Sequence, residues 1–185
     1  EPFASFLKKH FAAHKKYGSK DRKQIAHCCY CYFRAAHVLG DRSMDEKILA
    51  ALLLCSTTSD PVITALRPEW QDKLAASVEE KFTLLGITAV VTDLFPWNHV
   101  LSDAIDPLPF AASFLQQPDL FIRIRPGYHA ALKSQFQLKG ISFREISETC
   151  FAFSSGTKLD EYLQTNREAV IQDYNSQQVG ELLEP

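Results

Sequence analysis

Cysteine and histidine are the residue types in this chain best suited to chemistry, and several of them lie close together near the start of the sequence. Cys28 and Cys31 have the C-x-x-C spacing found in zinc and redox sites. A structural zinc site usually needs a second such pair, whereas Cys55 and Cys150 stand alone. We therefore interpret the cysteines as small apolar residues that pack a helix crossing, because free cysteine is commonly buried. No metal site is predicted.

Nucleophilic catalysis and nucleotide binding lack their usual residue patterns. His27 and His37 lie near the cysteines, but no Asn or Asp is placed in the sequence to orient either ring. The seven glycines are scattered singly, without G-x-G-x-x-G or G-x-x-x-x-G-K. The sequence therefore predicts no catalytic residue and no loop that closes on a phosphate or an adenosyl cofactor. A small enzyme that uses the cysteine-rich helix is the lowest-ranked alternative.

Basic residues give the clearest functional pattern. Residues 1–42 hold nine Lys and Arg against three Asp and Glu, a net charge of +6, which leaves −8 for residues 43–185. Such a local positive field attracts a polyanion even though the whole chain has a net charge of only −2. The alternative is an ordinary solvated helix face. The candidate phosphate-binding residues of this segment are Lys8, Lys9, Lys15, Lys16, Lys20, Arg22, Lys23 and Arg34.

Three of the candidate arginines have alternative interpretations. Arg34 follows Phe33 in an apolar helix and should have a fixed partner, either a phosphate or a buried carboxylate. Arg123 and Arg125 project from one face of a predicted strand, about 6.6 Å apart. This is close to the spacing of successive phosphates, which arginine binds through two hydrogen bonds. Ion pairs with acids such as Glu145 are the alternative.

The elements that must position these residues change in type along the chain. The first part is helical, and its second helix is apolar around most of its circumference, which is typical of a central core helix. The apolar periodicity predicts helices over 3–16, 20–39, 45–55, 61–67, 71–85 and 110–116. The second part alternates like strands at 119–125, 141–147, 150–153 and 169–172, with helices over 130–138, 159–164 and 176–183.

This order indicates an α+β protein with two domains. The predicted domains are an all-helical one over residues 1–110 and a β-α-β-β-α-β one over residues 118–185, which is the ferredoxin-like plan. A chain of 185 residues that is 46% hydrophobic can bury such cores. It has no run of the roughly 18–20 apolar residues that span a bilayer, so no membrane association is predicted. Five cysteines without framework spacing favour a reducing compartment, and the cytoplasm is expected.

Three stretches resemble the Fmu/Sun family of RNA (cytosine-C5) methyltransferases. "KDRKQIAHCCYCYFR" (20–34) is similar to the second helix of the family's NusB-like amino-terminal domain. "QPDLFIRIRPG" (117–127) resembles the strand that opens its small α/β domain. "VIQDYNSQQVGELLEP" (170–185) resembles the Q-D-x-x-S-Q segment that leads into the methyltransferase fold. By position, Arg34 matches the family's helix-two arginine, and Gln172, Asp173, Ser176 and Gln177 match the segment at the junction.

The resemblance implies a function for the complete protein. That protein would transfer a methyl group from S-adenosylmethionine to C5 of a cytosine, in ribosomal RNA of the small subunit. The catalytic cysteines and the cofactor loop of the family lie in a later domain, which we expect to be absent from these 185 residues. The chain is therefore expected to bind no cofactor or metal and to recognise RNA. The alternative is a NusB-like protein-interaction module without an RNA role.

Overall fold

The computed structural model describes residues 1–182, with side chains as far as residue 180. The chain divides into two compact units, residues 1–116 and residues 117–185. The first unit contains helices only, and the second contains one four-stranded antiparallel sheet with two α-helices. The chain is thus α+β. No helix among the described residues has both the length and the apolar character needed to cross a membrane.

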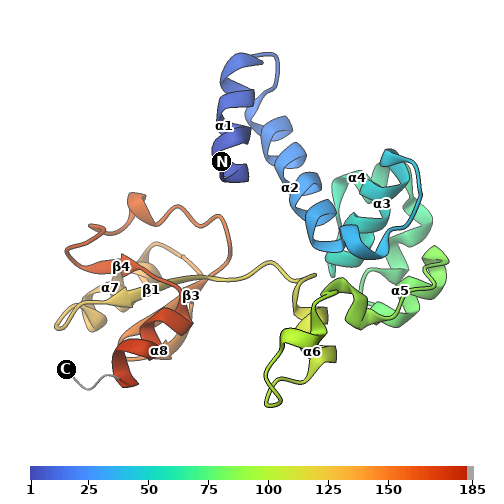
Figure 1. Ribbon diagram of the computed structural model, residues 1–185. Coiled ribbons are helices and arrows are strands. Elements are labelled where there is room, and N and C mark those ends of the chain that lie inside the picture. The colour runs from blue at the N-terminus through green and yellow to red at the C-terminus, as the bar shows by residue number, and fades with distance from the viewer. Residues whose placement is uncertain (183–185) are drawn as a thin grey trace. The chain divides into compact units, whose positions relative to one another are not determined.

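The first unit begins with a helical hairpin (Figure 1). Helix α1 (Phe3–Ala13) runs antiparallel to α2 (Ser19–Ala35), and a 3-10 turn (Ala36–Val38) continues α2. The prediction that the first helix extends to residue 16 was wrong. The helix ends because His14 leaves helical geometry while its N–H still bonds to the carbonyl of His10. Residues 14–18 then form the loop at the hairpin tip.

Side-chain caps begin the next helices of the first unit. Ser43 and Ser77 form capping boxes at the starts of α3 (Met44–Cys55) and α5 (Val78–Leu85). Asp60 caps α4 (Pro61–Leu66), with its Oδ1 atom 2.8 Å from the N–H of Val62. The predicted continuous helix over 71–85 was wrong, since a 3-10 segment (Pro68–Lys73) ends before the Ser77 cap. Two short 3-10 turns, Val91–Leu94 and Asn98–Val100, precede α6 (Pro107–Ser113).

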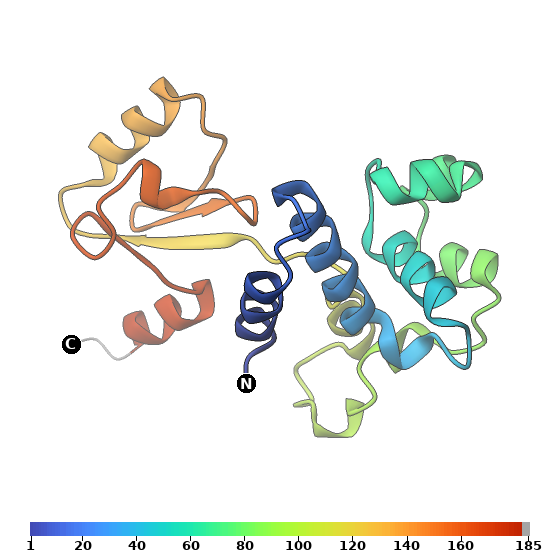
Figure 2. The ribbon, with the colours of Figure 1, turned by 90° about the horizontal axis from the view of Figure 1, so that it is seen from above.

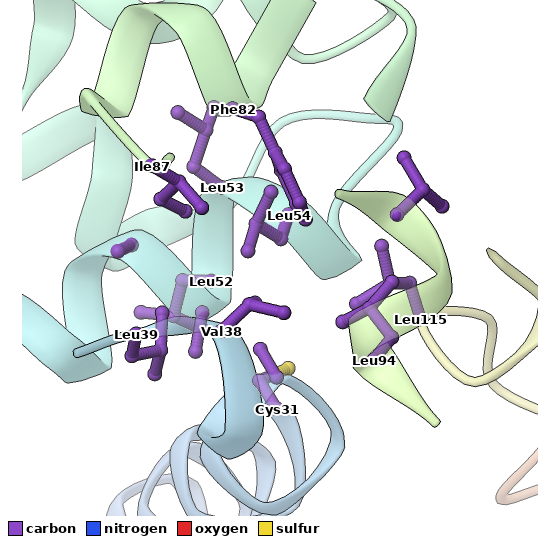
Figure 3. Close-up of a cluster of buried hydrophobic side chains, with 14 of the residues drawn as sticks. Cys31, Val38, Leu39, Leu52, Leu53, Leu54, Phe82, Ile87, Leu94 and Leu115 are labelled. Atoms are coloured by element: carbon purple, nitrogen blue, oxygen red, sulfur yellow. The ribbon is translucent and has the colours of Figure 1, made fainter. Parts of the chain in front are cut away.

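The core of the first unit surrounds α3. Leu52 and Leu53 are fully buried, and α3 makes its most extensive packing against α2. Figure 3 shows the carboxyl-terminal part of α2, α3 and α5 converging on this cluster together with the 3-10 turn at Val91–Leu94. The labelled side chains of the cluster are Cys31, Val38, Leu39, Leu52, Leu53, Leu54, Phe82, Ile87, Leu94 and Leu115. Cys31 is fully buried among them, as expected of a packing residue.

The second unit is built on a sheet with strand order β2-β3-β1-β4. Its strands are β1 (Leu120–Ile124), β2 (Arg144–Ser147), β3 (Cys150–Phe153) and β4 (Ala169–Ile171), and every pairing is antiparallel. Helix α7 (His129–Leu138) joins β1 to β2. The helix expected over 159–164 is a single 3-10 turn (Leu159–Glu161) in the connection from β3 to β4. Helix α8 (Tyr174–Leu182) follows β4, and residue 183 of the predicted final helix lies outside the described residues.

The two helices of the second unit lie on opposite faces of its sheet (Figure 2). Ile122 and Ile124 point from β1 into a core that Leu132 and Phe136 of α7 complete. On the other face, Phe121 of β1 stacks against Tyr174 of α8, with ring centroids 5.7 Å apart. The alternation along β1 therefore places Arg123 and Arg125 on the α8 face, because strand side chains point to opposite faces in turn.

Candidate nucleic-acid interface

Four of the predicted cations gather at the tip of the α1–α2 hairpin. Lys15 and Lys16 lie in the loop, and Lys20 and Lys23 lie one turn apart in the first turns of α2. All four are exposed, and none forms an ion pair with a described carboxylate. The nearby acid, Asp21, accepts a hydrogen bond from the backbone N–H of Gly18 and caps α2. The tip is therefore a concentrated positive surface, named here the lysine tip (Lys15, Lys16, Lys20, Lys23).

The other cations of the first unit do not belong to the lysine tip. Lys8 and Lys9 are exposed on α1, and the Nζ atom of Lys9 lies 2.9 Å from the Oε1 atom of Glu1. Arg34 lies 14 residues after Lys20 on α2, about 21 Å along the helix axis. The structure thus brings together only part of the set that the sequence pattern grouped.

Arg22 supports the hairpin from within. It is half-buried, and its Nε atom donates a hydrogen bond of 2.8 Å to the carbonyl oxygen of Tyr17. Its guanidinium also lies over the ring of Phe11, 5.9 Å from the centroid, which is cation–π geometry. These contacts fix the loop relative to α1. Arg22 therefore helps to position the lysine tip.

A row of aromatic and imidazole rings runs along the same hairpin, and the sequence interpretation missed it. The rings of Phe33, Phe3, Phe6, His10 and His14 follow one another with neighbouring centroids 4.3–6.2 Å apart. Among the residues of α1, only Leu7 and Phe11 are buried. Phe6 is 52% and Phe33 is 55% exposed. The five residues Phe33, Phe3, Phe6, His10 and His14 are named the ring track. The i, i+4, i+8 spacing of rings at residues 6, 10 and 14 is the sequence pattern that could have revealed it.

Arg34 lies in the last turn of α2, where it interacts with Cys55. Its guanidinium acts on the thiol of Cys55 through both charge and a hydrogen bond. A hydrogen bond from Cys31 is the largest cause that lowers the pKa of Cys55, and the charges of Arg34 and Lys81 act in the same direction against burial. Lys81 is almost fully buried and donates a 2.8 Å hydrogen bond to the carbonyl of Ser56. Arg34 therefore belongs to a polar cluster at the α2–α3 crossing.

His27 is oriented by an acid that no local sequence pattern marks. Its Nε2 atom lies 3.3 Å from the Oδ2 atom of the buried Asp60, which also caps α4. The sulfur of Cys31 lies 3.8 Å from both ring nitrogens. The hydrogen bond with Cys31 and the Asp60 carboxylate both raise the pKa of His27. Because Cys31 is fully buried and the pKa of its thiol is raised, chiefly by its hydrogen bond with Cys55, this Cys–His–Asp arrangement presents no reactive thiolate to a substrate.

Arg123 of β1 and Arg125, the residue after the strand ends, line a hollow in the second unit. Arg123, half-buried, and Arg125, exposed, share a cavity of about 390 Å³ with Thr149 and Gln177. Neither arginine pairs with a carboxylate whose side chain is described. The acid expected as their alternative partner, Glu145, instead binds Lys133 and His129 at 2.7 and 2.8 Å. The hydrogen bond from Lys133 is the largest cause that lowers the pKa of Glu145, and the contact with His129 acts in the same direction.

Of the four residues that the resemblance singles out before and within α8, Gln172, Asp173 and Gln177 make hydrogen bonds. The buried side chain of Gln177 donates a 2.9 Å hydrogen bond to the carbonyl of Gln172. The Oδ2 atom of Asp173 accepts a 3.1 Å hydrogen bond from the N–H of Asn175 at the start of α8. Ser176 is exposed. These contacts hold α8 against the end of β4.

Within residues 1–182, no group of three or more His, Cys, Asp and Glu side chains is arranged to hold a metal ion. The five cysteines are free thiols. Comparisons of the chain with known protein families, with curated proteins and with solved structures found no match.

Proposed function

We propose that this chain binds RNA, as the recognition region of an S-adenosylmethionine-dependent methyltransferase that modifies cytosine C5 in small-subunit ribosomal RNA. The observation that carries RNA binding is the lysine tip. Four exposed ammonium groups lie within one loop and two helical turns, and no described acid neutralises them. Clustered, unpaired cations of this kind are suited to a phosphate backbone, because binding releases the counterions of the nucleic acid.

The methyltransferase assignment is supported by the sequence resemblance and by the topology of the second unit. The strand order β2-β3-β1-β4 with antiparallel pairs is the order of a split β-α-β, ferredoxin-like domain, although a 3-10 turn stands in place of the second helix. We propose a NusB-like bundle for the all-helical first unit. Binding of the cofactor and methyl transfer are assigned to a further domain, and the cytoplasm is the proposed compartment.

A titration with small-subunit ribosomal RNA fragments at several salt concentrations tests RNA binding. We expect the affinity to fall steeply as salt rises, and the double variant Lys15→Gln/Lys20→Gln should flatten the slope of log K against log salt by about 0.7 for each phosphate that is no longer neutralised. The control is Lys73→Gln/Lys158→Gln, which removes two exposed lysines that are already paired with Asp72 and Glu161. The absence of binding at low salt, or equal effects of the two variants, would show the proposal to be wrong.

A protein partner is the second candidate, and one apolar hollow favours it. A cavity of about 350 Å³ is lined by Phe82, Ile87 and Val91, with Val90 and Leu108 exposed at its edge. Apolar contacts of this kind persist at high salt, unlike phosphate contacts. A partner bound there would be released by Val90→Asp, whereas RNA binding at the lysine tip would be unchanged.

A further inference from the structure

The ring track gives the α1–α2 hairpin a second property beyond its charge. Phe6 and Phe33 are more than half exposed, although aromatic rings are usually among the more buried side chains. His14 is also exposed, and its ring lies nearly parallel to that of His10, at an interplanar angle of 21°. The rings of Phe6, His14 and Phe33 are therefore accessible from solvent.

The rings of the track follow one another along the hairpin. Phe6 and His10 are four residues apart on α1, a step of about 6 Å along the helix axis. His14 follows just after the end of α1, with its ring centroid 4.3 Å from that of His10. Phe3 continues the row onto α2, where it meets Phe33 edge to face with centroids 4.8 Å apart. A ligand with several flat, unpaired groups in series can contact these rings one after another. An apolar helix of a partner protein would not require a row of rings.

The charges near the track select among flat ligands. The Nζ atom of Lys16 lies 5.1 Å from the ring centroid of Tyr17, and Tyr17 itself lies 6.4 Å from His10. The carboxyl-terminal end of the track thus joins the lysine tip. By the 100° step of a helix, Lys9 lies about 60° from Phe6 around α1, where it pairs with Glu1, and Lys8 lies about 160° from Phe6, on the far face. Rings beside phosphate-binding cations form the combination that proteins use for single-stranded nucleic acid.

We infer that the ring track (Phe33, Phe3, Phe6, His10, His14) binds single-stranded RNA by stacking unpaired bases on its exposed rings, while the lysine tip holds the phosphates. This inference rests on the proposed RNA binding and specifies the ligand. Bases inside a duplex have no free faces, so a double helix could contact the lysines but not the track.

The test compares a 12-nucleotide single-stranded RNA with a duplex of the same sequence by fluorescence anisotropy. The variants Phe6→Leu and Phe33→Leu keep an apolar side chain but remove one ring each, and far-UV circular dichroism checks that each folds. The matched control is Phe114→Leu, which changes another exposed ring of the same unit, stacked on Phe95 outside the track.

We expect the single strand to bind at least about tenfold more tightly than the duplex. Each track variant should weaken single-strand binding by about tenfold without changing the salt slope, and the control should bind like wild type. Equal affinity for both RNAs, or track variants that bind normally, would overturn the inference. A wild-type dimer that Phe6→Leu converts to a monomer would also overturn it, since the rings would then join two copies.

The outcomes separate this inference from the proposed function. If the lysine variants lose affinity while the ring variants do not, RNA binding stands and the stacking role falls. If wild type binds neither RNA at low salt, the proposed function fails first, and the inference fails with it.

Discussion

The ring of Phe3 meets the ring of Phe33 edge to face, with centroids 4.8 Å apart. Phe3 also meets Tyr30 of α2 in the same manner, at 5.4 Å. Neither Leu7 nor Phe11, the buried residues of α1, belongs to the main core cluster of the unit. Helix α1 is therefore held on α2 largely by ring contacts of its own.

Replacing Phe3 should loosen α1 without unfolding the unit. Each aromatic pair contributes about 0.5–1.5 kcal/mol beyond its buried area, and Phe3→Ala removes the pairs with Tyr30 and Phe33. We expect hydrogen exchange of the α1 amides to become at least about tenfold faster, while the amides of α3 are unchanged. Phe110→Ala, which disrupts rings around α6 instead, should leave α1 protected. Unchanged exchange in α1 after removal of the Phe3 ring would refute this account.

The contacts of His27 with Cys31 and Asp60 should make the stability of the fold depend on pH. The folded-state pKa of His27 is raised above 6.5, so the protonated ring stabilises the fold. This contribution is fully present below about pH 6.5 and is lost as the pH rises through the folded-state pKa. Because the ring is 45% exposed, we expect only about 0.5 kcal/mol. Urea unfolding of His27→Gln at several pH values measures it, and His99→Gln, an exposed histidine in a 3-10 turn, should behave like wild type.

The thiols should titrate in a defined order. The pKa of Cys55 is lowered, first by the hydrogen bond from Cys31 and then by the charges of Arg34 and Lys81, whereas burial raises the pKa of Cys28. Alkylation rates followed by mass spectrometry should therefore rise at lower pH for Cys55 than for Cys28, because the thiolate is the nucleophile.

Matched lysine variants check the electrostatic cause. Lys81→Met removes a buried charge near Cys55 and should move its alkylation profile to higher pH. Lys73→Met removes an exposed lysine that is paired with Asp72, so it should leave the alkylation profile of Cys55 unchanged. Identical profiles for Cys28 and Cys55 in the wild-type chain would contradict the assignment.

Arg123 and Arg125 should contribute to RNA binding independently of the lysine tip. Arg123→Gln and Arg125→Gln remove guanidiniums that no described side-chain carboxylate pairs with, so each should reduce the salt slope by about 0.7 if it holds a phosphate. Arg144→Gln provides the comparison, because Arg144 of β2 already binds Asp119 at 2.7 Å. Salt slopes from anisotropy titrations at four salt concentrations measure the difference. If Arg144→Gln changed the salt slope more than Arg123→Gln and Arg125→Gln, the hollow lined by Arg123 and Arg125 would be ruled out as a phosphate site.

Local patterns in the sequence were sufficient for much of the architecture. The capping residues Ser43 and Asp60 begin helices where expected, and the alternation around Ile122 and Ile124 predicted β1 with its arginines on one face. Such features depend on neighbours a few residues away, so they can be predicted from one sequence. The α+β class follows from them.

Tertiary structure decided which contacts the candidate residues make. His27 and Asp60 are 33 positions apart, and Arg34 meets Cys55 only because α2 crosses α3, so no local spacing could reveal either contact. The same holds for Phe6, because helical periodicity does not show that packing buries Leu7 and leaves Phe6 exposed. Periodicity determines which residues share a helix face, but only the neighbouring elements determine how much of that face is covered.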